Sequence, residues 1–204
     1  MSKTYQTKLL TPPANLPLRT NEVKETLNID VTDSTHDKEI DRLIRAATEV
    51  IQLATGRQII EAGFILVRRA FPGPGCPIYL PFGGIQDSPA VKIEYYDADN
   101  SKIELDAADF TVSQFMEPAE IEHVQGKPWP TTFRRSEAVQ VTFTCGMSKD
   151  AATLNNGMRQ ALLLQTKQLW GYEGESPHAL KADQEKLSRL INSQTLQDDF
   201  ISYG

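Results

Sequence analysis

The stretch DKEIDRLIRAATEVIQLATGR, residues 37–57, decides how the chain must fold. Its apolar side chains recur every three or four residues, which predicts an amphipathic helix with one face turned to a core. Gly56 is a natural C-terminal residue in the left-handed conformation, so the helix should end there. The apolar stripe needs a partner to cover it, and it consists of Ile40, Leu43, Ile44, Ala47, Val50, Ile51 and Ala54.

Beyond Gly56 the sequence changes to short segments rich in β-branched and aromatic residues, which predict strands. Turn-forming sequences such as PGPG (72–75) and DADNS (97–101) separate them, which favours hairpins in an antiparallel barrel or sandwich. The predicted strands are 64–71, 77–80, 90–97, 102–105, 109–115, 119–124 and 138–145.

Helical patterns flank this β segment on both sides. Before the main helix we expect a helix within 16–29. After the β segment we expect a helix at 154–170 with a wide apolar face and a last helix at 176–191. The fold class is therefore α+β, a helical core interrupted by an antiparallel β subdomain. The expected parts are an extended arm (1–17), a helical core (18–57 with 150–173), the β subdomain (58–149), and a C-terminal helix and tail (174–204).

Composition narrows the classes of function. The chain has 204 residues with 40% hydrophobic and 24% charged, enough for one good core or two small ones. A net charge of −6 argues against binding nucleic acid through its phosphates, and no apolar run approaches the roughly 20 residues of a membrane span. Cys76 and Cys145 are expected to be free thiols in a reducing cytosol, although they could pair if the fold brought them together.

The sequence carries no recognisable catalytic, cofactor-binding or metal-binding set of residues. His36, His123 and His178 are far apart and none has a second ligand at metal-binding spacing. One alternative is a small cytosolic enzyme or ligand-binding protein with its site in the β subdomain. Another is a helix-turn-helix DNA-binding protein, but the acidic loop 30–37 between the first two helices would repel phosphate.

Several motifs, taken in order, resemble the head–tail connector (adaptor) family of tailed phages, in the subgroup with a β insertion that also occurs in gene transfer agents. The resemblance covers roughly residues 9–173. It departs from the family in KDAATLNNG (149–157), which lacks a proline before the closing helix, and in LWGYEGESP (169–177) after it. The motifs are Leu16-Pro17, Val23-Lys24 with Leu27, the acidic loop 30–37, Thr55-Gly56-Arg57, YLPFGGIQD (79–87), VKIEYYDADN (91–100) and VTFTCGM (141–147).

The resemblance implies a structural virion protein without enzymatic activity or cofactor. Such adaptors form a ring, typically of twelve copies, beneath the portal protein of the phage neck. The ring extends the DNA channel and docks a stopper or tail-side neck protein. Genomic DNA passes through without sequence-specific binding, no membrane is involved, and assembly takes place in the bacterial host cytoplasm. Twelve copies at −6 each would carry a formal charge of about −72, and acidic walls would not grip DNA.

Two sets of residues are candidates for contacts with partners. The last predicted helix has only a narrow apolar stripe, Leu180, Leu187, Leu190 and Ile191, which we predict contacts the portal; the alternative is that it packs back on its own domain or frays. Trp129 and Phe133 are candidate inter-subunit anchors, because aromatic residues are favoured at interface centres. The alternative for Trp129 is that it closes the β core.

Overall fold

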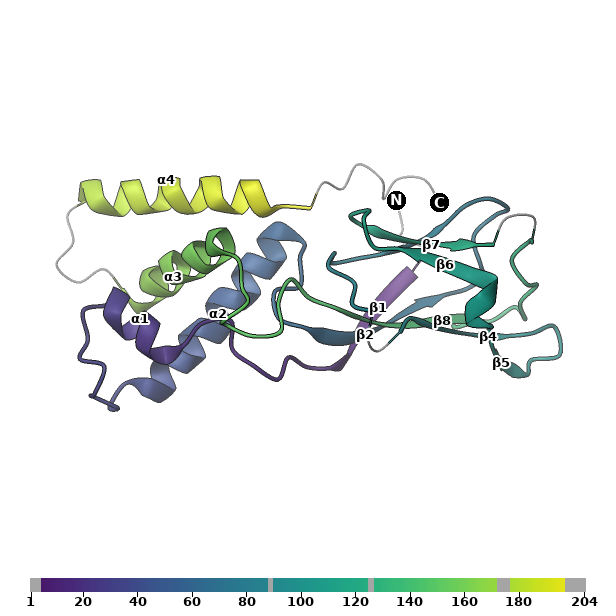
Figure 1. The fold of residues 1–204 in the computed structure, drawn as a ribbon, viewed down its shortest axis with the longest axis horizontal. Helices are drawn as coiled ribbons and strands as arrows, with labels where there is room; N and C mark the ends of the chain where they lie inside the picture. Colours follow the sequence, from purple (N-terminus) through teal and green to yellow (C-terminus); the bar gives the residue numbers. More distant parts are fainter. Residues whose placement is uncertain (1–4, 88–89, 125–126, 172–176, 197–204) are drawn as a thin grey trace. The chain divides into compact units, whose positions relative to one another are not determined.

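The computed structural model describes residues 5–87, 90–124, 127–171 and 177–196. These residues divide into two compact units, each with its own hydrophobic core. A helical unit comprises residues 14–61 and 147–196, and a β unit comprises 5–13 and 62–146 (Figure 1). Helices and antiparallel sheets together confirm the predicted α+β class.

The helical unit contains four helices: α1 (Thr20–Thr26), α2 (Asp37–Thr55), α3 (Asn156–Trp170) and α4 (Pro177–Gln194). Helix α2 ends as predicted, with Gly56 at φ 69° and its N–H donating to the Gln52 carbonyl at 2.9 Å. Helix α3 begins at a cap in which the Asn155 side chain accepts from the Met158 N–H at 2.8 Å. Helix α1 is shorter than expected, because Asn28 turns to φ 57° just after it.

The buried face of α2 is narrower than its sequence predicted. The residues that are fully buried are Ile40, Ile44, Ala47, Ile51 and Thr55. Leu43 is only half-buried. Ala54 is exposed and Val50 is 42% exposed, so the prediction that these two residues belong to the buried stripe is wrong. Helices α1, α3 and α4 cover a smaller arc of α2 than its apolar residues span. Thr55 can be buried because its hydroxyl donates to the Ile51 carbonyl at 2.8 Å.

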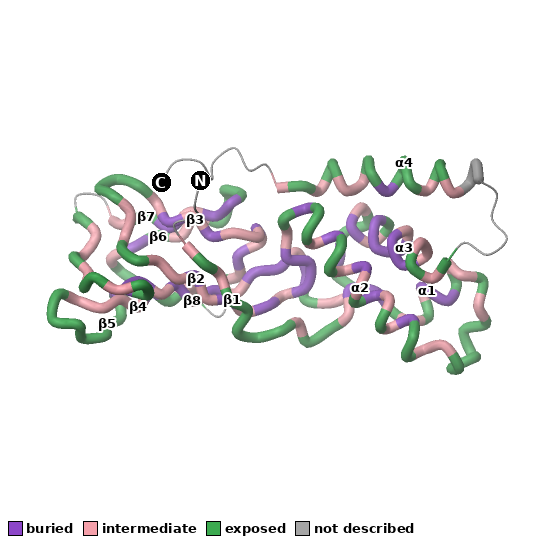
Figure 2. The backbone as a smooth tube through the Cα atoms, turned by 180° about the vertical axis from the view of Figure 1, so that it is seen from behind, coloured by how far each residue is buried: buried purple, intermediate pink, exposed green. Residues whose placement is uncertain are grey.

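The β unit consists of two antiparallel sheets that share one core. The larger sheet has the order β1 (Tyr5–Thr11), β2 (Ala62–Arg68), β8 (Val139–Cys145), β4 (Lys92–Tyr96), β5 (Lys102–Glu104). The smaller has the order β3 (Ile78–Leu80), β7 (Ala119–His123), β6 (Phe110–Ser113), with a short 3-10 helix at Ala107–Asp109. Burial alternates along β2 and β8, so one face of the larger sheet is in the core and the other is half-exposed (Figure 2).

The N-terminal segment differs from the expected arm. Residues 5–11 form strand β1, which pairs with β2 in a register that places Tyr5 opposite Arg68 and Leu9 opposite Phe64. The segment lacks the alternation of apolar and polar residues that marks a half-buried strand, so the strand can be recognised only from its pairing with β2. Pro12 and Pro13, which have no N–H to donate to a ladder, follow directly after the strand.

The sequence predicted the last helix as a part separate from the helical core. In the structure α4 belongs to the helical unit and packs against α3. The predicted tail beyond it, 197–204, lies outside the described residues. Across the described part of the chain, none of the helices combines the length and the apolar character that crossing a bilayer requires.

Candidate interaction surfaces

Within the described residues, no group of three or more His, Cys, Asp or Glu side chains is arranged to hold a metal ion. His36 contacts Glu39 and lies edge-on to Trp170, and His123 lies edge-on to Trp129. The side chain of His178 lies outside the described residues. The other candidate residues of the sequence lie on α4 and at positions 129 and 133.

The apolar stripe of α4 is largely covered inside the helical unit. Leu187 is 7% exposed and belongs to the core, Leu190 and Ile191 pack against it, and Leu180 is half-buried. Polar contacts hold the helix in place. The Lys167 ammonium is 3.2 Å from the Asp183 carboxylate, and Arg57 Nε donates to the Gln194 carbonyl at 2.6 Å. This matches the alternative in which the helix packs on its own domain, and portal contact by the four side chains stays a prediction.

The structure places the two aromatic candidates differently. Trp129 stacks on Phe71 with ring centroids 4.8 Å apart, and its indole N–H donates to the Cys76 carbonyl at 3.2 Å. It thus packs against the β core, as the alternative expected. Phe133 is 41% exposed, although its backbone N–H donates to the Tyr96 carbonyl at 3.0 Å. An inter-subunit role for either residue stays a prediction.

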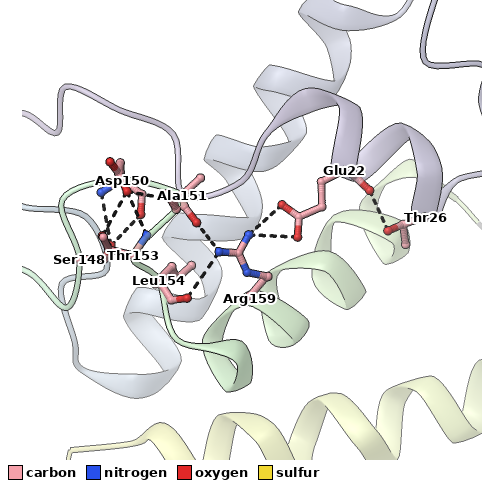
Figure 3. Close-up of polar contacts among 9 residues, drawn as sticks. Glu22, Thr26, Ser148, Asp150, Ala151, Thr153, Leu154 and Arg159 are labelled. Carbon is pink, nitrogen blue, oxygen red and sulfur yellow. Dashed lines mark hydrogen bonds and ion pairs between the residues drawn. The ribbon is translucent and has the colours of Figure 1, made fainter.

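A polar cluster joins α1 to the start of α3 (Figure 3). Arg159 donates from Nη1 to both Glu22 carboxylate oxygens, at 3.1 and 2.9 Å, and from Nη2 to the Ala151 carbonyl. In the same turn the Asp150 carboxylate accepts from the backbone N–H of Thr153 at 3.0 Å. This backbone bond is the main cause that lowers the pKa of Asp150, and a bond from the Thr153 hydroxyl lowers it further. These bonds tie α1 and residue 151 to the start of α3, so the cluster fixes the two helices relative to each other.

One surface that the sequence did not reveal is the hairpin of β6, β7 and residues 114–118, here called the acidic hairpin. Its tip carries Phe115, which is fully exposed, and Met116, which is 43% exposed. The predicted strand 109–115 treated Phe115 as a strand residue, whereas β6 ends at Ser113. A pair of apolar residues directly before Glu117-Pro118 was the available signal, since proline commonly marks a turn.

A second surface is a hollow of about 960 Å³ at the β1–β2 edge of the larger sheet, here called the basic hollow. Lys8, Arg68 and Arg69 contribute positive charge to its lining, and Glu137 contributes a negative charge. Ile65 and Val67 supply apolar surface there. Arg68 Nε is buried and has no hydrogen-bond partner among the described residues, and burial lowers the pKa of this guanidinium.

The two cysteines are both free. Cys76 is exposed, whereas Cys145 is buried in the β core, and this burial raises the pKa of its thiol to about 12. A thiol with such a pKa is protonated at neutral pH and is therefore a poor nucleophile.

Solved structures match the chain over nearly its whole length. A chain in the neck of an empty gene transfer agent (GTA) particle, computed with C6 symmetry, is 20% identical with a TM-score of 0.72; the match covers 94% of this chain and 96% of that chain. At the same coverage, a chain of the virion of a native GTA particle is 19% identical with a TM-score of 0.71. A chain of the neck of a native GTA particle, computed with C12 symmetry, is 20% identical with a TM-score of 0.68, again with 94% and 96% covered. The chain therefore shares the fold of these particle proteins. No protein-family model and no curated protein sequence matches it.

Proposed function

We propose that this protein is a structural head–tail connector, an adaptor that forms a ring in the neck of a phage-like particle such as a GTA. The observation that carries the proposal is the match of the whole chain, helical unit and β unit together, to chains of GTA particles at TM-scores of 0.68–0.72. A match that covers 96% of the other chains leaves no large domain of theirs unaccounted for.

The described chemistry supports a mechanical role. The polar cluster around Arg159 is satisfied internally, and the buried thiol of Cys145 is kept protonated by its surroundings. A net charge of −6 suits the wall of a channel through which DNA must slide. The matched structures are particle chains and lend no support to an enzyme with its site in the β unit.

The ring would lie beneath a portal protein and dock a stopper or tail-side neck protein, with assembly in the host cytoplasm. The neck structures computed with C6 and C12 symmetry support a ring. For the portal contact, α4 remains the candidate. Because its apolar stripe packs within the helical unit, α4 would either leave the unit or use its outer face, which carries Lys181, Glu185 and Arg189.

The test is to remove the protein from cells that assemble particles and to restore it with a tagged copy. We expect cells without it to accumulate DNA-filled heads that lack tails, visible by electron microscopy. The tagged copy should restore complete particles, co-purify with the portal protein, and appear in the neck. Normal particles without the protein, or a tagged copy that recovers only metabolic enzymes, would contradict the proposal.

A further inference from the structure

We propose that adjacent copies of this chain contact each other head to tail, with the tip of the acidic hairpin of one copy inserted into the basic hollow of the next. The inference rests on the proposed function and deepens it, because it names the surfaces that would join the ring. The two surfaces are complementary in both apolar character and charge.

The tip of the hairpin has the properties of an apolar anchor. Phe115 is fully exposed in the chain by itself, and Met116 beside it is 43% exposed. Exposing a phenylalanine to water costs the transfer free energy that its burial would return. Aromatic residues that enter a pocket on a partner commonly dominate the energy of an interface. The tip is therefore expected to be covered in the assembled state.

The hairpin also carries net negative charge. Residues 110–123 contain three carboxylates and neither Lys nor Arg: Glu117, Glu120 and Glu122. Half-burial, and then repulsion from Glu122, raise the pKa of Glu120. A surface of this kind is complementary to a partner that brings positive charge close to it.

The basic hollow offers that partner surface on the same chain. Lys8, Arg68 and Arg69 supply positive charge in a protein that is acidic as a whole. Ile65 and Val67 supply apolar area for a phenylalanine and a methionine. The volume of about 960 Å³ lies at the upper end of the range of clefts that enclose small ligands, so two neighbouring side chains fit.

The positions of the two surfaces favour a contact between copies. Ile65 and Val67 alternate with the buried Phe64 and Leu66, so they lie on the face of the larger sheet that points away from the core. The acidic hairpin belongs to the smaller sheet. This sheet packs on the opposite face of the larger sheet, the face that lies in the shared core. A contact between two different patches of one chain is heterologous. Repeated from copy to copy, it generates a closed ring when the rotation closes.

The test is photo-crosslinking of the full-length protein, with p-benzoylphenylalanine in place of Phe115. The protein is irradiated at about 0.5 mM, where even a contact with a millimolar Kd is populated. Mixing 15N-labelled and unlabelled chains distinguishes crosslinks between copies from those within one. We expect a ladder of oligomers whose intermolecular crosslinks map to residues 5–10, 65–71 or 136–140, the three segments that line the hollow.

A charge reversal tests the electrostatic part of the contact. Adding Arg69→Glu to the crosslinking protein should lower the yield at least about fivefold, because it places a carboxylate against the acidic hairpin. Lys181→Glu makes the same change in net charge on the exposed side of α4 and should leave the yield unchanged. Both replaced side chains are exposed, so both variants should keep the circular dichroism spectrum of the parent protein.

The outcomes separate this inference from the proposed function. Absence of crosslinks between copies, crosslinks that map outside the hollow, or equal effects of the two charge reversals would overturn the head-to-tail contact. None of these results would affect the placement of the protein in a particle neck. Conversely, crosslinks into the hollow would support the contact even if cells without the protein made normal particles.

Discussion

Helix α4 provides the sharpest test of the helical unit, because the same stripe was a candidate for portal contact. We consider Leu187→Ala. Leu187 is 7% exposed and belongs to the core shared by α2, α3 and α4. Replacing a buried leucine by alanine costs about 2–5 kcal/mol of unfolding free energy, and a terminal helix can partly collapse onto the cavity. We therefore expect a loss of about 2–3 kcal/mol.

The assay is urea unfolding followed by circular dichroism at 222 nm, since α1–α4 all belong to the helical unit. With a denaturant slope of about 1–2 kcal/mol per M, the midpoint should fall by about 1–3 M. Leu53→Ala is the matched control, because Leu53 lies on α2 and is 86% exposed; its effect should stay within about 0.5 kcal/mol. If Leu187→Ala were as mild as this control, α4 would not be docked, and its stripe would be free for a partner.

Three further predictions address the polar cluster and the thiols. Glu22→Ala should lower the unfolding free energy by about 1–2 kcal/mol in the same assay, because it removes the carboxylate whose two oxygens both accept from Arg159 Nη1. An effect below about 0.5 kcal/mol, the size expected of an exposed ion pair, would refute this role. The folded-state pKa of Asp150 is lowered, so its stabilisation is complete above the unfolded pKa of about 3.9 and is lost as the pH falls through the folded pKa. Asp150→Ala should therefore lower the melting temperature at pH 7 and progressively less below pH 4; a difference that does not change with pH would contradict this. A maleimide reagent at pH 7 should label the exposed Cys76 in the native protein and reach Cys145 only after denaturation, and mass spectrometry would show two native labels if this were wrong.

The sequence alone determined the class of the fold and the main helix. The period of apolar residues in 37–57 and the glycine at its end specify α2 and its C-terminus, because both signals are local. The alternating segments after Gly56 predicted strands for the same reason, and most of them lie at or near the observed strands. The order of motifs predicted a head–tail connector, and the solved structures that share the fold are particle neck and virion chains.

Features that depend on contacts between distant residues were decided by the tertiary structure. Strand β1 forms because β2, more than fifty residues later, supplies its hydrogen-bond partners, and no local pattern marks it. The true buried arc of α2 depends on which neighbours cover it, so Val50 and Ala54 remain outside although the period includes them. The exposure of Phe115 and the gathering of Lys8, Arg68 and Arg69 around one hollow are likewise products of folding, because strand pairing sets both. Sequence period fixes which face of an element is apolar, whereas only packing fixes which apolar residues remain free to bind a partner.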